Sequence, residues 1–103
     1  MGRRKRQISP VHPGEILNEE FLKPLGMTVN ALALALRVPS NRLYAIVEGA
    51  RSITADTALR LARYFGTSAE FWVNLQAHYD LELARREAEE SIEASVQPRE
   101  QLT

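Results

Sequence analysis

The sequence predicts an all-α protein in which five helices form one domain. Three observations support this fold class. Apolar residues recur at spacings of three and four positions, each such stretch is bounded by a helix-capping residue or by Gly and Pro, and no stretch alternates apolar and polar residues like a half-buried strand. The 103 residues are enough for one small domain, and a chain with 45% hydrophobic and 25% charged residues has the composition of an ordinary soluble globular protein.

The first helix is expected to begin at His12. Pro13 suits the first helical position because its missing N–H would have no partner there, and Glu15 places a carboxylate near the positive end of the helix. Pro24 and Gly26 are expected to end it. One apolar stripe at four-residue spacing is predicted to be buried: Leu17, Phe21 and Leu25.

Two short helices with a tight turn between them are expected next. Thr28 is a good N-cap for a helix over residues 29–36, residues 37–39 form the turn, and the following helix runs from about residue 40 to 48 before Gly49 ends it. The apolar positions expected to face the core are Leu32, Ala33, Leu36, Leu43, Ile46 and Val47.

The fourth helix is expected over residues 55–65, with Thr54 as its N-cap and Gly66 as its stop. Its inward positions are Ala58, Leu61, Ala62 and Phe65.

The last helix is expected to begin after the cap residue Ser68 and to end before Pro98. Its apolar stripe is formed by Phe71, Trp72, Leu75, Tyr79 and Leu83. After Leu83 the residues are mostly Arg, Glu and Ala, which favour a helix but leave it little to bury. This part of the helix therefore either frays or packs on a partner.

Charge is unevenly distributed along the chain. Residues 1–66 carry ten Lys and Arg against five Asp and Glu, whereas residues 67–103 carry three against eight, so a net charge of +5 is followed by one of −5. We expect residues 1–9 to form a flexible basic arm, residues 10–97 the helical domain and residues 98–103 a loose tail. A basic half next to an acidic half indicates two surfaces, one of which attracts polyanions.

The helices at 29–36 and 40–48 have the dimensions of a helix-turn-helix, in which Val38 fills the corner. With Leu43 and Ile46 facing the core, the second helix presents its first turns to the major groove of DNA. Asn grips adenine and Arg grips guanine in bidentate fashion, each pair giving roughly 1–3 kcal/mol of discrimination. The candidate base-contacting residues are Ser40, Asn41, Arg42, Tyr44 and Ala45.

Phosphate contacts are expected from the segments on either side. Thr28 and Asn30 stand at the start of the preceding helix, where free N–H groups also face an anion, and Arg51 follows the recognition helix. Each basic contact of this kind neutralises a phosphate and releases a counterion.

Several functional classes are disfavoured. The chain has no cysteine, and its two histidines, His12 and His78, are far apart, so no metal site is expected. The acidic run after residue 86 reads as a solvated helix face, and no acid, base and nucleophile stand together, so no catalytic site and no cofactor are expected. The chain has no apolar run near the roughly 18 residues of a membrane span and no signal-peptide pattern, which predicts a cytoplasmic protein.

Four segments carry a family resemblance: HPGE at 12–15, VPSNR at 38–42, GARSITADTALRLA at 49–62 and FWVNLQ at 71–76. Together they resemble HigA/VapI-type antitoxins of the lambda-repressor-like (Cro/C1, XRE) helix-turn-helix class, over about residues 10–84. The resemblance implies a lambda-repressor-like DNA-binding domain with an extended C-terminal helix. It also implies a homodimer that autorepresses its operon and a partner toxin of the HigB type, which is an mRNA-cleaving enzyme resembling RelE.

A two-fold dimer would cover a palindromic operator whose half-sites lie about 34 Å apart, one turn of DNA. The alternative is a solitary XRE-type repressor without a toxin, and an enzyme is a remote third. Neither the toxin-contacting surface nor the choice between the last helix and the region of the fourth and fifth helices as dimer interface follows from the sequence.

Three positions depart from the wider helix-turn-helix pattern. Arg37 stands where glycine is frequent, and a left-handed backbone there would cost about 1 kcal/mol. Pro39 stands where a serine N-cap is frequent, and it pre-sets the helix start instead. Val29 replaces a glutamine that contacts phosphate in many relatives, which leaves Asn30 as the substitute.

Overall fold

The computed structural model describes residues 9–100 and contains helices and loops over that range, with no strand. Its elements, in chain order, are α1 (Pro13–Ile16), η1 (Leu17–Leu22), α2 (Lys23–Leu25), α3 (Val29–Leu36), α4 (Ser40–Val47), α5 (Ala55–Phe65) and α6 (Ala69–Ser95). Because α1, η1 and α2 follow one another without a break, they form one helix, and the all-α prediction with five helices is confirmed. The basic arm predicted for residues 1–9 lies outside the described residues except at Ser9.

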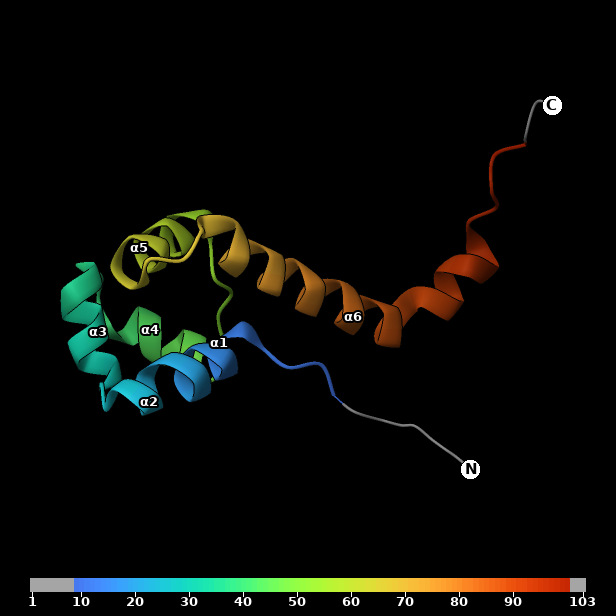
Figure 1. Ribbon diagram of the computed structural model, residues 1–103. Coiled ribbons are helices and arrows are strands. Elements are labelled where there is room, and N and C mark those ends of the chain that lie inside the picture. The colour runs from blue at the N-terminus through green and yellow to red at the C-terminus, as the bar shows by residue number, and fades with distance from the viewer. Residues whose placement is uncertain (1–8, 101–103) are drawn as a thin grey trace.

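The elements from α1 to α5 cluster together, and α6 leaves this cluster as a long single helix (Figure 1). α6 packs along α5 and against α1 with its first turns. Beyond Ala88 every described residue of the chain is exposed, although the helix continues to Ser95. The segment after Leu83 is therefore helical but contributes little to the core of this chain.

The core lies between η1, α3, α4, α5 and the beginning of α6. Its buried apolar residues are Leu17, Leu22, Leu32, Ala33, Leu36, Leu43, Ile46, Ile53, Ala58, Leu61 and Trp72. The predicted inward positions Val47, Ala62 and Phe65 are half-buried at its edge. In the stripe predicted for α6, Trp72 is buried, whereas Phe71 is 38% exposed.

The prediction for the first helix is wrong at Leu25, which is 62% exposed. Leu25 is exposed because the helix contains the π-helical turn η1. At the end of η1 the N–H of Lys23 donates to the carbonyl of Asn18, five residues back. The wider turn moves the buried face from four-residue to five-residue spacing. As a result Leu17 and Leu22 are both buried, and Leu25 is turned to solvent.

The caps and stops expected for α3, α4 and α5 are confirmed. The hydroxyl of Thr28 accepts from the N–H of Ala31 at 3.0 Å, and Thr54 accepts in the same way from Thr57 at 3.4 Å. Each cap satisfies a helix N–H that has no partner within the helix. Gly49 and Gly66 follow the last turns of α4 and α5, as the sequence predicts.

Candidate nucleic-acid interface

Helix α4 has a buried face and an exposed face. Leu43 and Ile46 are completely buried beneath it, and they fix the helix on the core. Asn41 is exposed, and Tyr44 is 46% exposed on the opposite side. Ser40, Arg42 and Ala45 are half-buried beside them. The five candidate base-contacting residues therefore lie on the surface of one firmly anchored helix.

The amino end of α4 is open. Pro39 is its N-cap in an extended conformation, and no side chain caps this end of the helix. The N–H of Arg42 donates to the Pro39 carbonyl at 3.1 Å. The positive end of the helix dipole and the N–H groups of Ser40 and Asn41, which no side chain caps, thus face an anion such as a phosphate. This agrees with the expectation that Pro39 pre-sets the helix start in place of a serine cap.

The turn between α3 and α4 contains Arg37 in the left-handed conformation, with φ 60° and ψ 46°. It closes α3 with two reverse hydrogen bonds, from Val38 N–H to Ala33 carbonyl at 3.1 Å and from Arg37 N–H to Leu34 carbonyl at 3.3 Å. This is the Schellman pattern, which usually places glycine where Arg37 stands. The strain foreseen for this position is therefore present.

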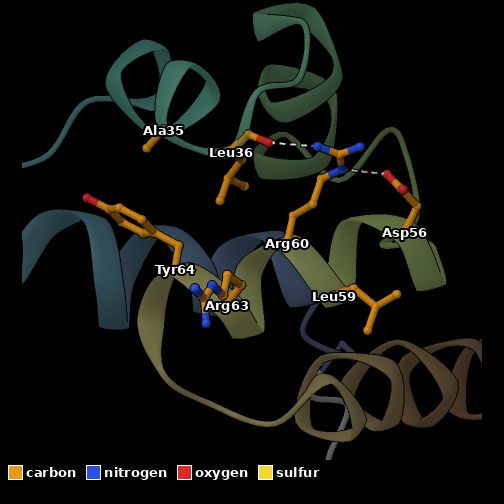
Figure 2. A pocket seen from close by; sticks show the side chains of 7 residues that line it. All are labelled: Ala35, Leu36, Asp56, Leu59, Arg60, Arg63 and Tyr64. Atoms are coloured by element: carbon orange, nitrogen blue, oxygen red, sulfur yellow. Dashed lines mark hydrogen bonds and ion pairs between the residues drawn. The ribbon is translucent and has the colours of Figure 1, made fainter.

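An arginine of α5 supports this turn. Arg60 donates from Nη1 to the Leu36 carbonyl at 2.9 Å and to the Arg37 carbonyl at 3.5 Å. Its Nε donates to Asp56 at 2.9 Å (Figure 2). Leu36, Asp56 and Arg60 border a hollow of about 510 Å³ between α3 and α5, which Leu59 and Tyr64 also line.

Arg42, in α4, binds the same Asp56 carboxylate as Arg60. Its Nη1 donates to Asp56 Oδ2 at 3.2 Å, and its side chain is 26% exposed. The hydrogen bond from Arg60, and next the charges of Arg60 and Arg42, hold the pKa of the Asp56 carboxyl below its ordinary value. The carboxylate is therefore ionised at neutral pH and shared by two guanidinium groups.

The candidate phosphate-contacting residues lie on the neighbouring segments. Thr28 and Asn30 are exposed at the first turn of α3, which packs against α4, and Arg51 is exposed in the loop that follows α4. The Thr28 hydroxyl oxygen is used in the cap, so its hydrogen remains free to donate. Val29 is half-buried against the core, so the neighbouring Asn30 is the exposed amide side chain at this turn.

The loop with Arg51 is held from two sides by Gln76 and His12, whose contacts with this loop the sequence did not predict. Gln76, buried in α6, accepts from the N–H of Ile53 at 2.8 Å. His12 receives the N–H of Gly14 on Nδ1 at 2.9 Å and hydrogen-bonds the backbone of Arg51. The only signal in the sequence was an amide, Gln76, at a position of helical spacing from Trp72 and Tyr79.

Other kinds of site are not found in the described range. Within residues 9–100 no three His, Asp or Glu side chains gather in a way that could hold a metal ion. No helix in that range combines the length and the apolar character that a membrane crossing needs.

Known proteins resemble the chain in sequence and in fold. A helix-turn-helix family model matches residues 19–72, a range that contains every candidate DNA-contacting residue. Virulence-associated protein I of Dichelobacter nodosus is 53% identical over 83 residues, which cover 81% of this chain and 77% of that protein.

Two solved structures show the same architecture. An addiction module antidote protein of the HigA family from Coxiella burnetii has 54% sequence identity and a TM-score of 0.84, over 88% of this chain and 99% of that one. The Pseudomonas aeruginosa antitoxin HigA, solved with the higBA promoter, has 46% identity and a TM-score of 0.85, also over 88% and 99%.

Proposed function

The chain belongs to the XRE-type helix-turn-helix family, and from this premise we propose that it is a sequence-specific DNA-binding antitoxin. It acts as a homodimer, represses its own operon and neutralises a HigB-type toxin. One observation carries the DNA-binding part: the exposed ridge from Ser40 to Ala45 is fixed to the core through the fully buried Leu43 and Ile46. A similar chain has been solved with promoter DNA.

In this proposal the mechanism is occupancy of the operator, without a covalent step. Asn41 and Arg42 read base edges, and Ser40, Tyr44 and Ala45 complete the contact surface in the major groove. Thr28, Asn30 and Arg51 contact phosphates and so set the register of the protein on the duplex. A bound dimer then covers the promoter and blocks transcription.

The test is a mobility-shift titration on the upstream region of its own gene. The double variant Asn41→Ala with Arg42→Ala should lose at least ~30-fold in specific affinity, because two bidentate base contacts are removed. His78→Ala, an exposed change on α6, is the matched control and should bind like the parent. Parent-like binding by the folded double variant would mean that α4 is not the recognition helix.

For the homodimer we propose the apolar face of the second half of α6 as the contact between copies. Leu81, at the middle of α6, and Ile92 are 50% and 52% exposed, and Val96, directly after the helix, is 63% exposed. An isolated helix of about this length is marginal in water. In an antiparallel pair centred on Ala88, Ile92 of one copy stands across from the small Ala84 of the other. The face is thus complementary to itself in size.

The charges beside this face suit the same pairing. Arg85 of one copy would lie between Glu89 and Glu93 of the second copy, so unlike charges meet. Ile92→Glu should shift the protein to monomer in analytical ultracentrifugation, whereas Glu90→Gln, on the opposite side of the helix, should leave the dimer intact. A dimer that survives Ile92→Glu and Leu81→Glu together would exclude this face.

Neutralisation of a toxin rests on the relatives, which are named as an antidote protein and an antitoxin. The experiment is co-expression with the product of the adjacent reading frame, followed by affinity purification. A stable complex in which the toxin's RNA cleavage is blocked supports the antitoxin role. A chain that always elutes alone points instead to a solitary repressor.

A further inference from the structure

We propose that Asp56, in the first turn of α5, determines DNA specificity by positioning the Arg42 guanidinium for base recognition. The inference rests on the proposed function, because it takes α4 as the recognition helix. Asp56 would touch no base itself. It would act through Arg42, which belongs to a different helix and lies fourteen positions earlier in the chain.

The Asp56 carboxylate is held in a fixed place by contacts with the rest of the fold. Asp56 Oδ2 accepts from Arg60 Nε at 2.9 Å, and the same guanidinium donates to the carbonyl of Leu36 at 2.9 Å. Figure 2 shows this chain of contacts running from the end of α3 to the first turn of α5. Asp56 is thereby tied, through Arg60, to the end of α3 directly before the turn that precedes the recognition helix. The position of its carboxylate relative to α4 is therefore fixed before DNA binds.

Arg42 keeps free donors while it is bound to Asp56. A guanidinium has five N–H donors in a rigid fork, and the contact with Asp56 uses Nη1. Bidentate binding of guanine needs only one edge of the fork. A carboxylate behind the group can therefore orient it and leave an edge for the base. An arginine ordered before binding also loses less side-chain entropy on the DNA.

A purely structural role for Asp56 is the competing explanation. An acidic residue in the first turn favours a helix, but α5 already has its N-cap in Thr54, which accepts from Thr57. A structural role predicts that substitution of Asp56 weakens binding to all DNA in proportion to lost folding. Positioning predicts a change in the choice between sequences.

The negative charge of Asp56 also affects DNA binding directly, and this effect has the opposite sign to a loss of positioning. A carboxylate near DNA repels phosphates, so its removal alone should tighten binding to every duplex to a similar degree. Loss of positioning should instead weaken binding to the operator and leave non-specific binding equal or tighter. The ratio of the two affinities therefore reports on positioning and is independent of the general electrostatic gain.

The experiment measures dissociation constants by fluorescence anisotropy at one fixed salt concentration. The duplexes are the upstream region of its own operon, the same duplex with single G·C pairs replaced, and an unrelated sequence. The variants are Asp56→Asn, which keeps the shape of the side chain, Asp56→Ala, Arg42→Ala and the double variant Arg42→Ala with Asp56→Ala. Glu48→Gln removes an exposed carboxylate at the end of α4 and is the matched charge control. Thermal unfolding of each variant shows that it is folded.

We expect Asp56→Asn and Asp56→Ala to lose at least ~3-fold in the ratio of specific to non-specific affinity, the scale of coupling between residues in contact. The loss should fall on the same base pair that Arg42→Ala affects, and Asp56→Ala should add nothing once Arg42 is absent. Glu48→Gln should leave the ratio unchanged.

Two results would overturn the inference, and they differ in what they leave standing. If both Asp56 variants keep the parent's discrimination while Arg42→Ala loses it, positioning is refuted and the recognition helix remains. If Arg42→Ala itself keeps full discrimination, the role of Arg42 in the proposed function fails together with the inference.

Discussion

Arg60 donates a hydrogen bond from Nη1 to the carbonyl oxygen of Leu36 at 2.9 Å, so a side chain of α5 closes the carboxyl end of α3. The last carbonyls of a helix have no partner within it, and a cation is favoured there by the helix dipole. This contact ties α5 to the end of α3, where the helix-turn-helix corner begins. It makes the geometry of the turn depend on a residue outside it.

Arg60→Met should therefore lower the free energy of unfolding by about 1 kcal/mol, because a charged hydrogen bond is lost from a partly exposed site. Urea denaturation followed by circular dichroism measures the change. Arg63→Met, three positions along the same helix, is the control and should have little effect. An Arg60→Met protein as stable as the parent would show that the turn closes without this contact.

The turn itself offers a stabilising change. Arg37 has φ 60°, a region in which every residue with a Cβ is strained and glycine is not. Arg37→Gly should raise the free energy of unfolding by about 0.5–1 kcal/mol, even though glycine makes the unfolded chain more flexible. A melting temperature higher by a few degrees would report it. Lower stability would mean that the Arg37 side chain contributes more than its backbone costs.

The opposite effect is expected at Gly14, where α1 crosses α4. A Cβ on Gly14 would stand 1.8 Å from the carbonyl oxygen of Ile46, and backbone cannot move aside as a side-chain tip can. Gly14→Ala should cost about 3 kcal/mol or more, at the upper end of overpacking, and displace α4.

Gly26→Ala is the comparison for this prediction. Nothing lies within 4 Å of a Cβ there, and the position has only the strain of φ +62°. We expect a cost of about 1 kcal/mol. Equal losses at Gly14 and Gly26, measured by chemical denaturation, would contradict the close helix crossing.

The sequence predicted the elements whose ends carry their own signals. Thr28 and Thr54 cap α3 and α5 at the expected residues, because such caps act on N–H groups two or three positions away. Leu25 was misplaced since a π-helical turn leaves no comparable local signal. The exposed ridge on α4 followed from helical periodicity alone, and its DNA contacts stay a prediction.

The side-chain contacts that connect the α4 ridge to α5 could not be predicted from the sequence. Arg42 meets Asp56 and Arg60 meets Leu36 because α5 packs against α3. Many other pairs at such separations would fit the same composition. Periodicity assigns a residue to a face, but the partner across the fold depends on the crossing of two helices.

Stability should also fall in mild acid because of His12. Burial lowers the pKa of its imidazole below the ordinary value, an effect that the charge of Asp80 and the hydrogen bond to Arg51 oppose. The neutral ring is required, since Nδ1 accepts the N–H of Gly14 and an imidazolium has no acceptor. The ring also packs edge-on against Tyr79 at 4.9 Å.

Proton linkage gives the direction in which the free energy of unfolding changes with pH. With a folded-state pKa below the unfolded value of about 6.5, the unfolded chain binds more protons between the two values, so stability rises with pH there. The contribution of His12 is complete above the unfolded pKa and is lost as the pH falls through the folded one. Urea midpoints measured from pH 7.5 to 5 should therefore decrease.

The matched variants assign this dependence to one ring. His12→Asn keeps an acceptor suited to a helix N-cap and removes the titrating group, so the decrease should flatten. His78→Gln, an exposed change, should keep the slope of the parent. Asp56 has its pKa lowered from a value near 4, so it titrates below this window. A slope that persists in His12→Asn would place the acid sensitivity elsewhere in the protein.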